Sequence, residues 1–255
     1  MLLAIDIGNS HIVLGCLNGD TITKTLRIVT DTKKTEDQYA AEIKGIFDFS
    51  GVDCRGFGGA IIASVVPPVT SALRRAVKRL TGISPLMVGA GIKTGLNIHI
   101  EDASELGADA VCVSVAALAK YGAPCAVIDL GTATKILVLD HSGTYIGGAI
   151  APGVAISADA LTSRASLLPS VSLDAPKRAI SGVTAEAMKS GIVFGAAAMV
   201  DGMLRRFKAE LGMPLRAVAT GGIAPSIIPH CAEKITLDEN LILDGLRLIY
   251  EKNRK

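Results

Sequence analysis

The sequence predicts an α/β fold built from two similar halves, and three observations support this prediction. The segment LAIDIGNSHIVLG at Leu3–Gly15 returns as AVIDLGTATKILV at Ala126–Val138, with Asp129 lying 123 residues after Asp6 in a chain of 255. Strand-like and helix-like runs alternate along both halves. The composition, 49% hydrophobic with 27 glycines and no Trp, is typical of a compact α/β enzyme. We therefore expect domains over residues 1–115 and 116–255, with a cleft between them.

Each copy of the repeat has the features of a β-hairpin whose turn approaches an anion. A short apolar run ends in an aspartate, a glycine follows two residues later, and small hydroxyl or amide side chains come next. Gly8 and Gly131 allow the backbone to approach a ligand closely, and Asp6 and Asp129 could hold a cation, as phosphate chemistry requires. An ordinary hairpin explains one copy equally well. Two copies at half-chain spacing favour a phosphate site.

The first half contains further periodic segments. Apolar spacing predicts a helix over Glu36–Phe49. The run GGAIIASVVPP, which ends at Pro68, predicts a central parallel strand that leads into a prolyl turn. The other expected elements are a basic helix over Ser71–Leu80, a strand over Ser84–Gly89 and a helix over Ser104–Tyr121 with Ser104 as its N-cap.

The second half repeats this plan. Two strands are expected around Asp129, and a third over Tyr145–Ile150. A later strand ends in Gly221 and Gly222, and a strand that stops in paired glycines is a usual approach point for phosphate or ribose. Helices are expected over Ile156–Ser163, Ala185–Leu211 and Leu241–Lys252.

The charge pattern disfavours a nucleic-acid partner. Acidic and basic residues are spread along the chain, and the formal net charge is +2. One basic run, Arg74, Arg75, Lys78 and Arg79, falls on one side of the predicted helix. A solvated helix face explains such a run better than a surface for phosphate backbones, because charge blocks of this length are common.

The chain carries no sign of a membrane partner or of secretion. No basic region precedes the first strand, and no stretch of about 18 apolar residues lacks a charge or a helix breaker. The five cysteines are scattered without a C-x-x-C pair, and most of them are expected to be buried. We therefore expect a protein of the reducing cytoplasm.

Several common catalytic motifs are absent from the sequence. It has no G-x-x-x-x-G-K-[ST] phosphate loop, no G-x-S-x-G elbow and no H-E-x-x-H pair. The four histidines, His11, His99, His141 and His230, are isolated, so they are better explained as exposed or hydrogen-bonded residues than as metal ligands. Catalysis is therefore expected to depend on carboxylates, hydroxyls and backbone groups.

An ordered set of motifs spans nearly the whole chain. It comprises DIGNS at Asp6, GAD at Gly107, DLGTAT at Asp129, GGAIAPG at Gly147, SRASLLP at Ser163, Thr184 before AMKSG, TGG at Thr220 and LDGL at Leu243. Each motif is weak alone, but in this order the set is similar to type III pantothenate kinase. That family lies within the superfamily of acetate and sugar kinases, chaperone ATPases and actin.

The resemblance implies a fold and a reaction. The fold would be α/β, with two ribonuclease-H-like domains, each a mixed sheet flanked by helices, around an ATP cleft. The reaction would be the ATP-dependent phosphorylation of pantothenate to 4'-phosphopantothenate, the first step of coenzyme A biosynthesis. Magnesium would accompany the nucleotide. A monovalent cation, potassium or ammonium, would sit on Asp129.

The resemblance also implies roles for individual residues. Asp109 would be the general base. The ATP-binding residues would be Asp6, Ile7, Gly8, Asn9, Ser10, His11, Ile12, Val13 and Thr132, and the pantothenate-binding residues would be Gly107, Ala108, Asp109, Ala110 and Thr184. A carboxylate that accepts the proton of a primary hydroxyl suits phosphoryl transfer. From its position alone, Asp109 is equally well explained as a carboxylate that stabilises the start of a helix.

The chain departs from the family pattern at three places. Ala110 stands where the family has Arg after the base, Lys135 stands where the second hairpin has another Thr, and NIHIEDASEL lacks the family's tyrosine. Lys135 would restore positive charge near the nucleotide if its side chain faces the site. The missing arginine leaves two alternatives open: a nucleotide-binding regulatory relative without catalytic activity, and a kinase for another small acid or a sugar.

The resemblance implies a homodimer with the acceptor pocket near the subunit boundary. The Ala-, Gly- and Met-rich stretch Ala185–Met203 could pack closely against another helix. Packing inside one subunit explains the same composition equally well, because small residues serve both kinds of contact.

Overall fold

The computed structural model describes residues 1–254 and divides into two compact units. The first unit contains residues 1–96, 102–116 and the closing segment from residue 241, and the second contains residues 97–101 and 117–240. The division expected from the sequence, at residues 115 and 116, differs in the closing segment. Helix α8 (Leu241–Asn253) packs on two strands of the first sheet, and it therefore belongs to the first unit.

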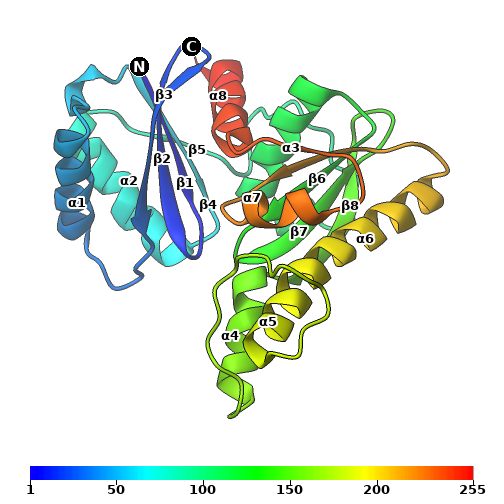
Figure 1. Cartoon of the computed structure of the whole chain (residues 1–255). Coiled ribbons are helices and arrows are strands. Elements are labelled where there is room, and N and C mark those ends of the chain that lie inside the picture. Colours follow the sequence, from blue (N-terminus) through cyan, green and yellow to red (C-terminus); the bar gives the residue numbers. More distant parts are fainter. Residues whose placement is uncertain (255) are drawn as a thin grey trace. The chain divides into compact units, whose positions relative to one another are not determined.

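The first unit is built on a five-stranded mixed sheet (Figure 1). Its strands are β1 (Leu2–Ile7), β2 (His11–Asn18), β3 (Thr21–Val29), β4 (Gly59–Ser64) and β5 (Leu86–Met87), in the order β3-β2-β1-β4-β5. The first three strands are antiparallel, whereas β4 is parallel to β1 and to β5. The predicted first hairpin and the predicted central parallel strand are therefore confirmed.

The second unit has the same sheet topology. Its strands are β6 (Cys125–Leu130), β7 (Ala133–Leu139), β8 (Tyr145–Pro152), β9 (Arg216–Thr220) and β10 (Ile235–Leu237), in the order β10-β9-β6-β7-β8. Strands β6, β7 and β8 are antiparallel, and β9 is parallel to β6 and to β10. Strand for strand, this is the arrangement of the first sheet, so the predicted duplicated α/β fold is confirmed.

Two helices of the first unit pack together on one face of its sheet, and α8 lies on the other face (Figure 1). They are α1 (Glu36–Phe49) and α2 (Pro67–Thr81). Helix α1 has the predicted bounds because Thr35 and Gln38 form a reciprocal capping box at its start. Its apolar face, with Tyr39, Ile43 and Phe47 fully buried, lies in the core of the unit.

The helix expected over Ser104–Tyr121 begins later than predicted. The side chain of Asp102 caps a short 3₁₀ turn at Ala103–Glu105 by accepting a hydrogen bond from the Ser104 backbone, and α3 extends over Ala108–Tyr121. The prediction that Ser104 is the helix cap is therefore wrong. As a result, Asp109 lies in the first turn of the helix, where the helix dipole stabilises a negative charge.

The second unit contains one long helical run. Helices α5 (Thr184–Lys189) and α6 (Gly195–Leu211) are joined by a π-helical turn, and α4 (Val154–Arg164) and α7 (Ala224–Ile227) are shorter. Among residues 1–254, the run Thr184–Leu211 is the one helix that is long and apolar enough to cross a membrane. Core helices of soluble proteins pass the same test, and Val193, Ala197 and Leu204 of this run are buried in the core of the unit.

Candidate functional site

The first hairpin turn joins β1 to β2 and presents its polar side chains to solvent. Asn9, Ser10 and His11 are exposed. The Gly8 N–H donates to the His11 carbonyl (3.0 Å), and Thr30, just after β3, donates its hydroxyl hydrogen to the Gly8 carbonyl (2.6 Å). The turn is therefore held from two sides. Thr30 was not found by sequence reasoning, because strand β3 was not predicted.

Asp109 lies at the carboxyl ends of the two central strands of the first sheet. The Val65 N–H, just beyond β4, donates to the carbonyl of Ile7, the last residue of β1 (3.1 Å). A Cβ atom built on Gly107 would lie 3.3 Å from the Val65 side chain and 2.6 Å from Asp109 Oδ1. The start of α3 therefore approaches the strand ends at a glycine, where no side chain separates them.

The structure brings Asp6 and Asp109 close to the same thiol. Cys112 is fully buried one turn into α3. Burial raises the pKa of this thiol well above its usual value, and the negative charges of Asp6 and Asp109 raise it further. Two aspartates that are 103 residues apart in the sequence thus share one electrostatic environment within the first unit. Ala110, next to Asp109, is buried, and its N–H donates to Asp109 Oδ1 (2.7 Å).

The second hairpin has a turn one residue shorter than the first, and its charges differ. Gly131 N–H donates to the Ala133 carbonyl (3.2 Å), and Thr132 in the turn is exposed. Asp129 lies in β6 between two cross-strand neighbours, Lys135 in β7 and Thr220 in β9. Lys135 Nζ is 3.0 Å from Asp129 Oδ2. Directly opposed residues project from the same face of a sheet, so Lys135 faces the same side as Asp129.

Glycines permit two close backbone approaches beside this second turn. Gly153, which precedes α4, lies so near the turn that a Cβ atom there would fall 2.0 Å from the Thr132 carbonyl oxygen. Gly221, after β9, has φ of +100°, and its Cβ would fall 2.5 Å from the Leu130 carbonyl oxygen. Gly221 therefore lets the segment after β9 pass close to the end of β6.

The remaining predicted site residue, Thr184, is the exposed first residue of α5 in the second unit. The first unit holds the segments Asp6–Val13 and Gly107–Ala110, and the second holds Asp129 and Thr132. The predicted site residues therefore fall into two sets, one in each unit. Sequence reasoning left open which way Lys135 faces, and its direct pairing with Asp129 places it on the same face of the second sheet as Asp129.

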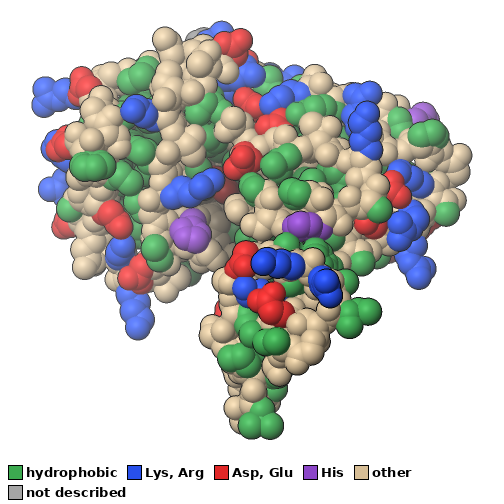
Figure 2. All heavy atoms as spheres, viewed as in Figure 1, with side chains coloured by type: hydrophobic (Ala, Val, Ile, Leu, Met, Phe, Trp, Pro, Cys, Tyr) green, Lys and Arg blue, Asp and Glu red, His purple; other side chains and the backbone are tan. Residues whose placement is uncertain are grey.

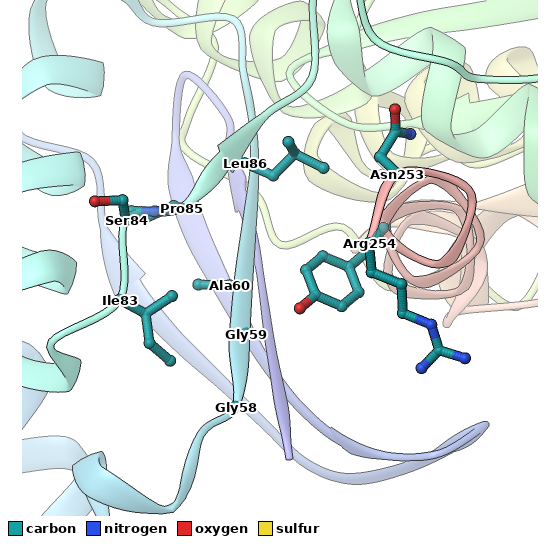
Figure 3. A pocket seen from close by; sticks show the side chains of 10 residues that line it. Gly58, Gly59, Ala60, Ile83, Ser84, Pro85, Leu86, Asn253 and Arg254 are labelled. Atoms are coloured by element: carbon teal, nitrogen blue, oxygen red, sulfur yellow. The ribbon is translucent and has the colours of Figure 1, made fainter.

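Two surface cavities of the first unit lie away from these residues. One, of about 240 Å³, is lined at the amino end of β4 by Gly58 and Gly59 and at the end of α8 by Tyr250 and Arg254 (Figure 3). The other lies beside the basic run on α2, where Arg75 pairs with Glu36 of α1 (2.6 Å) and Arg79 pairs with Asp37. These ion pairs partly neutralise the run, as expected for a solvated helix face. On the side shown in Figure 2, positive and negative side chains are interspersed.

Comparisons with known proteins agree with the motif set. A curated type III pantothenate kinase from an Exiguobacterium species is 44% identical over 255 residues, with complete coverage of both chains. Another, from Roseiflexus castenholzii, is 43% identical and also covers both chains completely. The fold is similar to that of the activator of 2-hydroxyisocaproyl-CoA dehydratase from Clostridium difficile with bound ADPNP (TM-score 0.54, 13% identity, covering 98% of this chain and 93% of that chain).

The model of one family matches residues 2–206, from the first strand to the middle of α6, and both hairpins and the start of α3 lie within this range. Together with full-length relatives at more than 40% identity, this match shows that the chain belongs to the type III pantothenate kinase family.

Proposed function

We propose that this protein transfers the γ-phosphoryl group of ATP to pantothenate and forms 4'-phosphopantothenate, the first step of coenzyme A biosynthesis. One structural observation supports this most strongly: the exposed turn after β1 and the Asp109 carboxylate lie at the carboxyl ends of β1 and β4 in one unit. Phosphoryl transfer depends on positioning and charge stabilisation, so a phosphate-binding turn and a carboxylate close together suit it.

The two hairpins would bind the nucleotide. In the first, the turn from Gly8 to Ser10 would face the phosphates, with Asp6, Ile7, His11, Ile12 and Val13 completing the loop. In the second, Thr132 would contact ATP from the exposed turn beside Gly153. Backbone N–H groups in such turns bind phosphate oxygens without a P-loop sequence.

Asp109 would act as the general base for the pantothenate hydroxyl. It lies in the first turn of α3, and a carboxylate within hydrogen-bond reach of a hydroxyl can accept its proton. Gly107, Ala108 and Ala110 would line the acceptor beside it, and Thr184 would contribute from α5. Ala110 presents only a methyl group, and it is buried. The acceptor would therefore have to be held without the arginine found elsewhere in the family.

The residues present fit magnesium bound together with ATP. Mg²⁺ prefers carboxylate and phosphate oxygens and keeps several waters. Asp6 and Asp109 supply two carboxylates in the first unit, and both lie close enough to Cys112 for their charges to raise the pKa of its thiol. Either could hold a water of the metal's coordination shell. Bound magnesium would supply charge neutralisation at the transferring phosphoryl group.

The residues present do not fit a monovalent cation on Asp129. The carboxylate that would bind the ion lies 3.0 Å from the Lys135 ammonium, and the two side chains are only 16% and 18% exposed. A second positive charge about 4 Å from that ammonium would meet a repulsion of roughly 4 kcal/mol at an effective dielectric constant near 20. In this chain, we therefore assign no potassium or ammonium ion to Asp129.

The protein would act as a cytoplasmic homodimer. Large apolar side chains are exposed near α4 and the segment between α4 and α5, notably Leu161, Leu167, Ile180 and Val183. Figure 2 shows hydrophobic side chains at the lower end of the second unit, where Figure 1 draws this segment. Exposed apolar side chains gathered in one region of a protein can mark an interface.

The proposed reaction can be tested by product analysis. Purified protein with ATP, magnesium and pantothenate should form ADP and phosphopantothenate in equal amounts, as measured by mass spectrometry. Sugars and acetate in place of pantothenate should give no phosphorylated product. If the protein bound nucleotide but left pantothenate unchanged, it would be a regulatory relative without catalytic activity, and the proposal would be wrong.

A further inference from the structure

Lys135 places a fixed positive charge directly on Asp129. The two residues are cross-strand partners in the β6-β7 hairpin, and Lys135 Nζ lies 3.0 Å from Asp129 Oδ2. Both side chains are more than four-fifths buried. An ion pair on neighbouring strands and largely out of water is held in place by the sheet and is screened little by salt. The ammonium is therefore a permanent feature of the second hairpin.

The position of this charge matters because it lies beside the turn. On one face of the second sheet, Asp129 has Lys135 on one side and Thr220 on the other. Gly131 and Thr132 follow Asp129 by two and three residues and form the exposed turn, and the backbone of Gly153 lies against them. A cation bound by Asp129 would lie beside its carboxylate at the end of β6. The Lys135 ammonium already lies there.

We propose that the Lys135 ammonium replaces the monovalent cation, so that this protein binds ATP and transfers its phosphoryl group without potassium. This inference depends on the proposed function, because it concerns the nucleotide site of that reaction. A threonine at position 135 has no charge and would leave Asp129 to recruit an ion from solution. A lysine carries a compact positive charge on a flexible stem. It neutralises Asp129 and supplies positive charge near the phosphates without depending on the salt concentration.

The direct test compares nucleotide binding with and without potassium. Calorimetric titrations with magnesium and a non-hydrolysable ATP analogue would be run in potassium chloride and in tetramethylammonium chloride at equal ionic strength. For the unmodified protein we expect the two dissociation constants to agree within twofold. For Lys135→Thr we expect weak binding in tetramethylammonium and at least tenfold tighter binding in potassium.

A matched control shows whether the potassium response of Lys135→Thr is specific to position 135 or follows the loss of any ion-paired lysine. Lys120 Nζ forms another ion pair in the second unit, 2.6 Å from Asp238 Oδ2. Lys120→Thr should respond to potassium no more than the unmodified protein does. Lys135→Met removes the charge but keeps much of the side-chain length, and it should respond to potassium as Lys135→Thr does.

Thermal unfolding without nucleotide gives a second readout. Potassium should raise the melting temperature of Lys135→Thr by a few degrees, because an ion that binds only the folded state stabilises it. It should leave the unmodified protein and Lys120→Thr unchanged. This measurement remains informative even if the protein binds no nucleotide, in which case the proposed function fails while the cation replacement is still tested.

Two results would overturn the inference. One is a potassium response of more than twofold in nucleotide affinity, or a potassium-dependent rise in melting temperature, in the unmodified protein. The other is a Lys135→Thr protein that responds to potassium no more than the unmodified protein in both measurements. If Lys135→Thr does not fold, Lys135→Met and the unmodified protein still decide the question.

Discussion

Gly245 of α8 lies directly against the backbone of Cys112 in α3: a Cβ atom at position 245 would fall 2.0 Å from the Cys112 carbonyl oxygen. Cys112 in turn lies within the electrostatic reach of Asp6 and Asp109. The closing helix therefore packs on the segment that carries Asp109, and only a residue without a side chain permits this approach. Helix α8 thus supports a site built from residues near the beginning and the middle of the chain.

We expect Gly245→Ala to destabilise the protein and to lower its kinase activity. Overpacking a closely packed contact costs about 1–3 kcal/mol, and α3 would shift with Asp109. The matched control is Gly45→Ala in α1, where a Cβ atom would meet nothing within 4 Å; it should raise stability by up to about 1 kcal/mol. Denaturant unfolding and turnover of both variants check this. Equal stability of the two variants would contradict the packing account.

Gly153→Ala is expected to weaken nucleotide binding. An added Cβ atom would fall 2.0 Å from the Thr132 carbonyl oxygen, so the turn that holds Thr132 would have to move. We expect the dissociation constant for ATP to rise at least tenfold, as measured by calorimetry. Gly182→Ala, where a Cβ atom meets nothing within 4 Å, should bind as the unmodified protein does. Unchanged binding by Gly153→Ala would indicate that the turn takes no part in the nucleotide site.

The buried thiols make stability fall in alkaline solution. Burial raises the pKa of Cys16 and of Cys125 from 9.0 to about 11. Between these values the unfolded chain loses thiol protons that the folded chain keeps. The stability that these protonated thiols contribute is therefore complete below pH 9 and is lost as the pH rises to 11. Each thiol should contribute a loss of at most about 1.4 kcal/mol per pH unit.

Denaturant unfolding at a series of pH values measures this loss. Replacing Cys16 and Cys125 by alanine should flatten the stability profile between pH 9 and pH 11, although the variant starts from a lower stability because the contacts of the two buried sulfur atoms are lost. If the free energy of unfolding of the variant fell as steeply between pH 9 and pH 11, groups other than these two thiols would cause the loss of stability.

The exposed apolar segment of the second unit is expected to form the dimer contact. Leu167 and Ile180 are both more than 90% exposed, and replacing both by Asp would place charges in an apolar interface. We expect the double variant to sediment as a monomer at concentrations where the unmodified protein is a dimer. Phe49→Asp is the control, because Phe49 is 92% exposed at the end of α1 in the first unit. A double variant that remains dimeric would place the interface elsewhere.

The sequence predicted most of the fold because its strongest signals are local. The spacing of apolar residues predicted α1 with the bounds that are observed. The duplicated aspartate segments predicted the positions of both hairpins. Strands β3 and β10 were missed, since β3 is mostly exposed and β10 has three residues. The strand expected over Ser84–Gly89 is reduced to Leu86–Met87, because its pairing with β4 involves only two residue pairs.

The site was harder to predict than the fold. The approach of Gly245 to Cys112 and of Gly107 to Val65 brings together segments that are distant in the sequence, and no local pattern encodes such contacts. The boundary of α3 was misplaced because Asp102 caps Ser104 in a separate turn. Pairing of Lys135 with Asp129 follows from the hairpin register, and a three-residue loop over residues 131–133 could have predicted it.

The measurement that tests the central claim most directly is single-turnover transfer of the γ-phosphoryl group from ATP to pantothenate, with the unmodified protein and Asp109→Asn side by side. We expect transfer by the unmodified protein, a loss of at least a hundredfold in its rate constant for Asp109→Asn, and equal ATP affinity in both, because general-base catalysis contributes about 10²–10⁴ in rate. An Asp109→Asn protein that transfers the phosphoryl group at the unmodified rate would contradict the account.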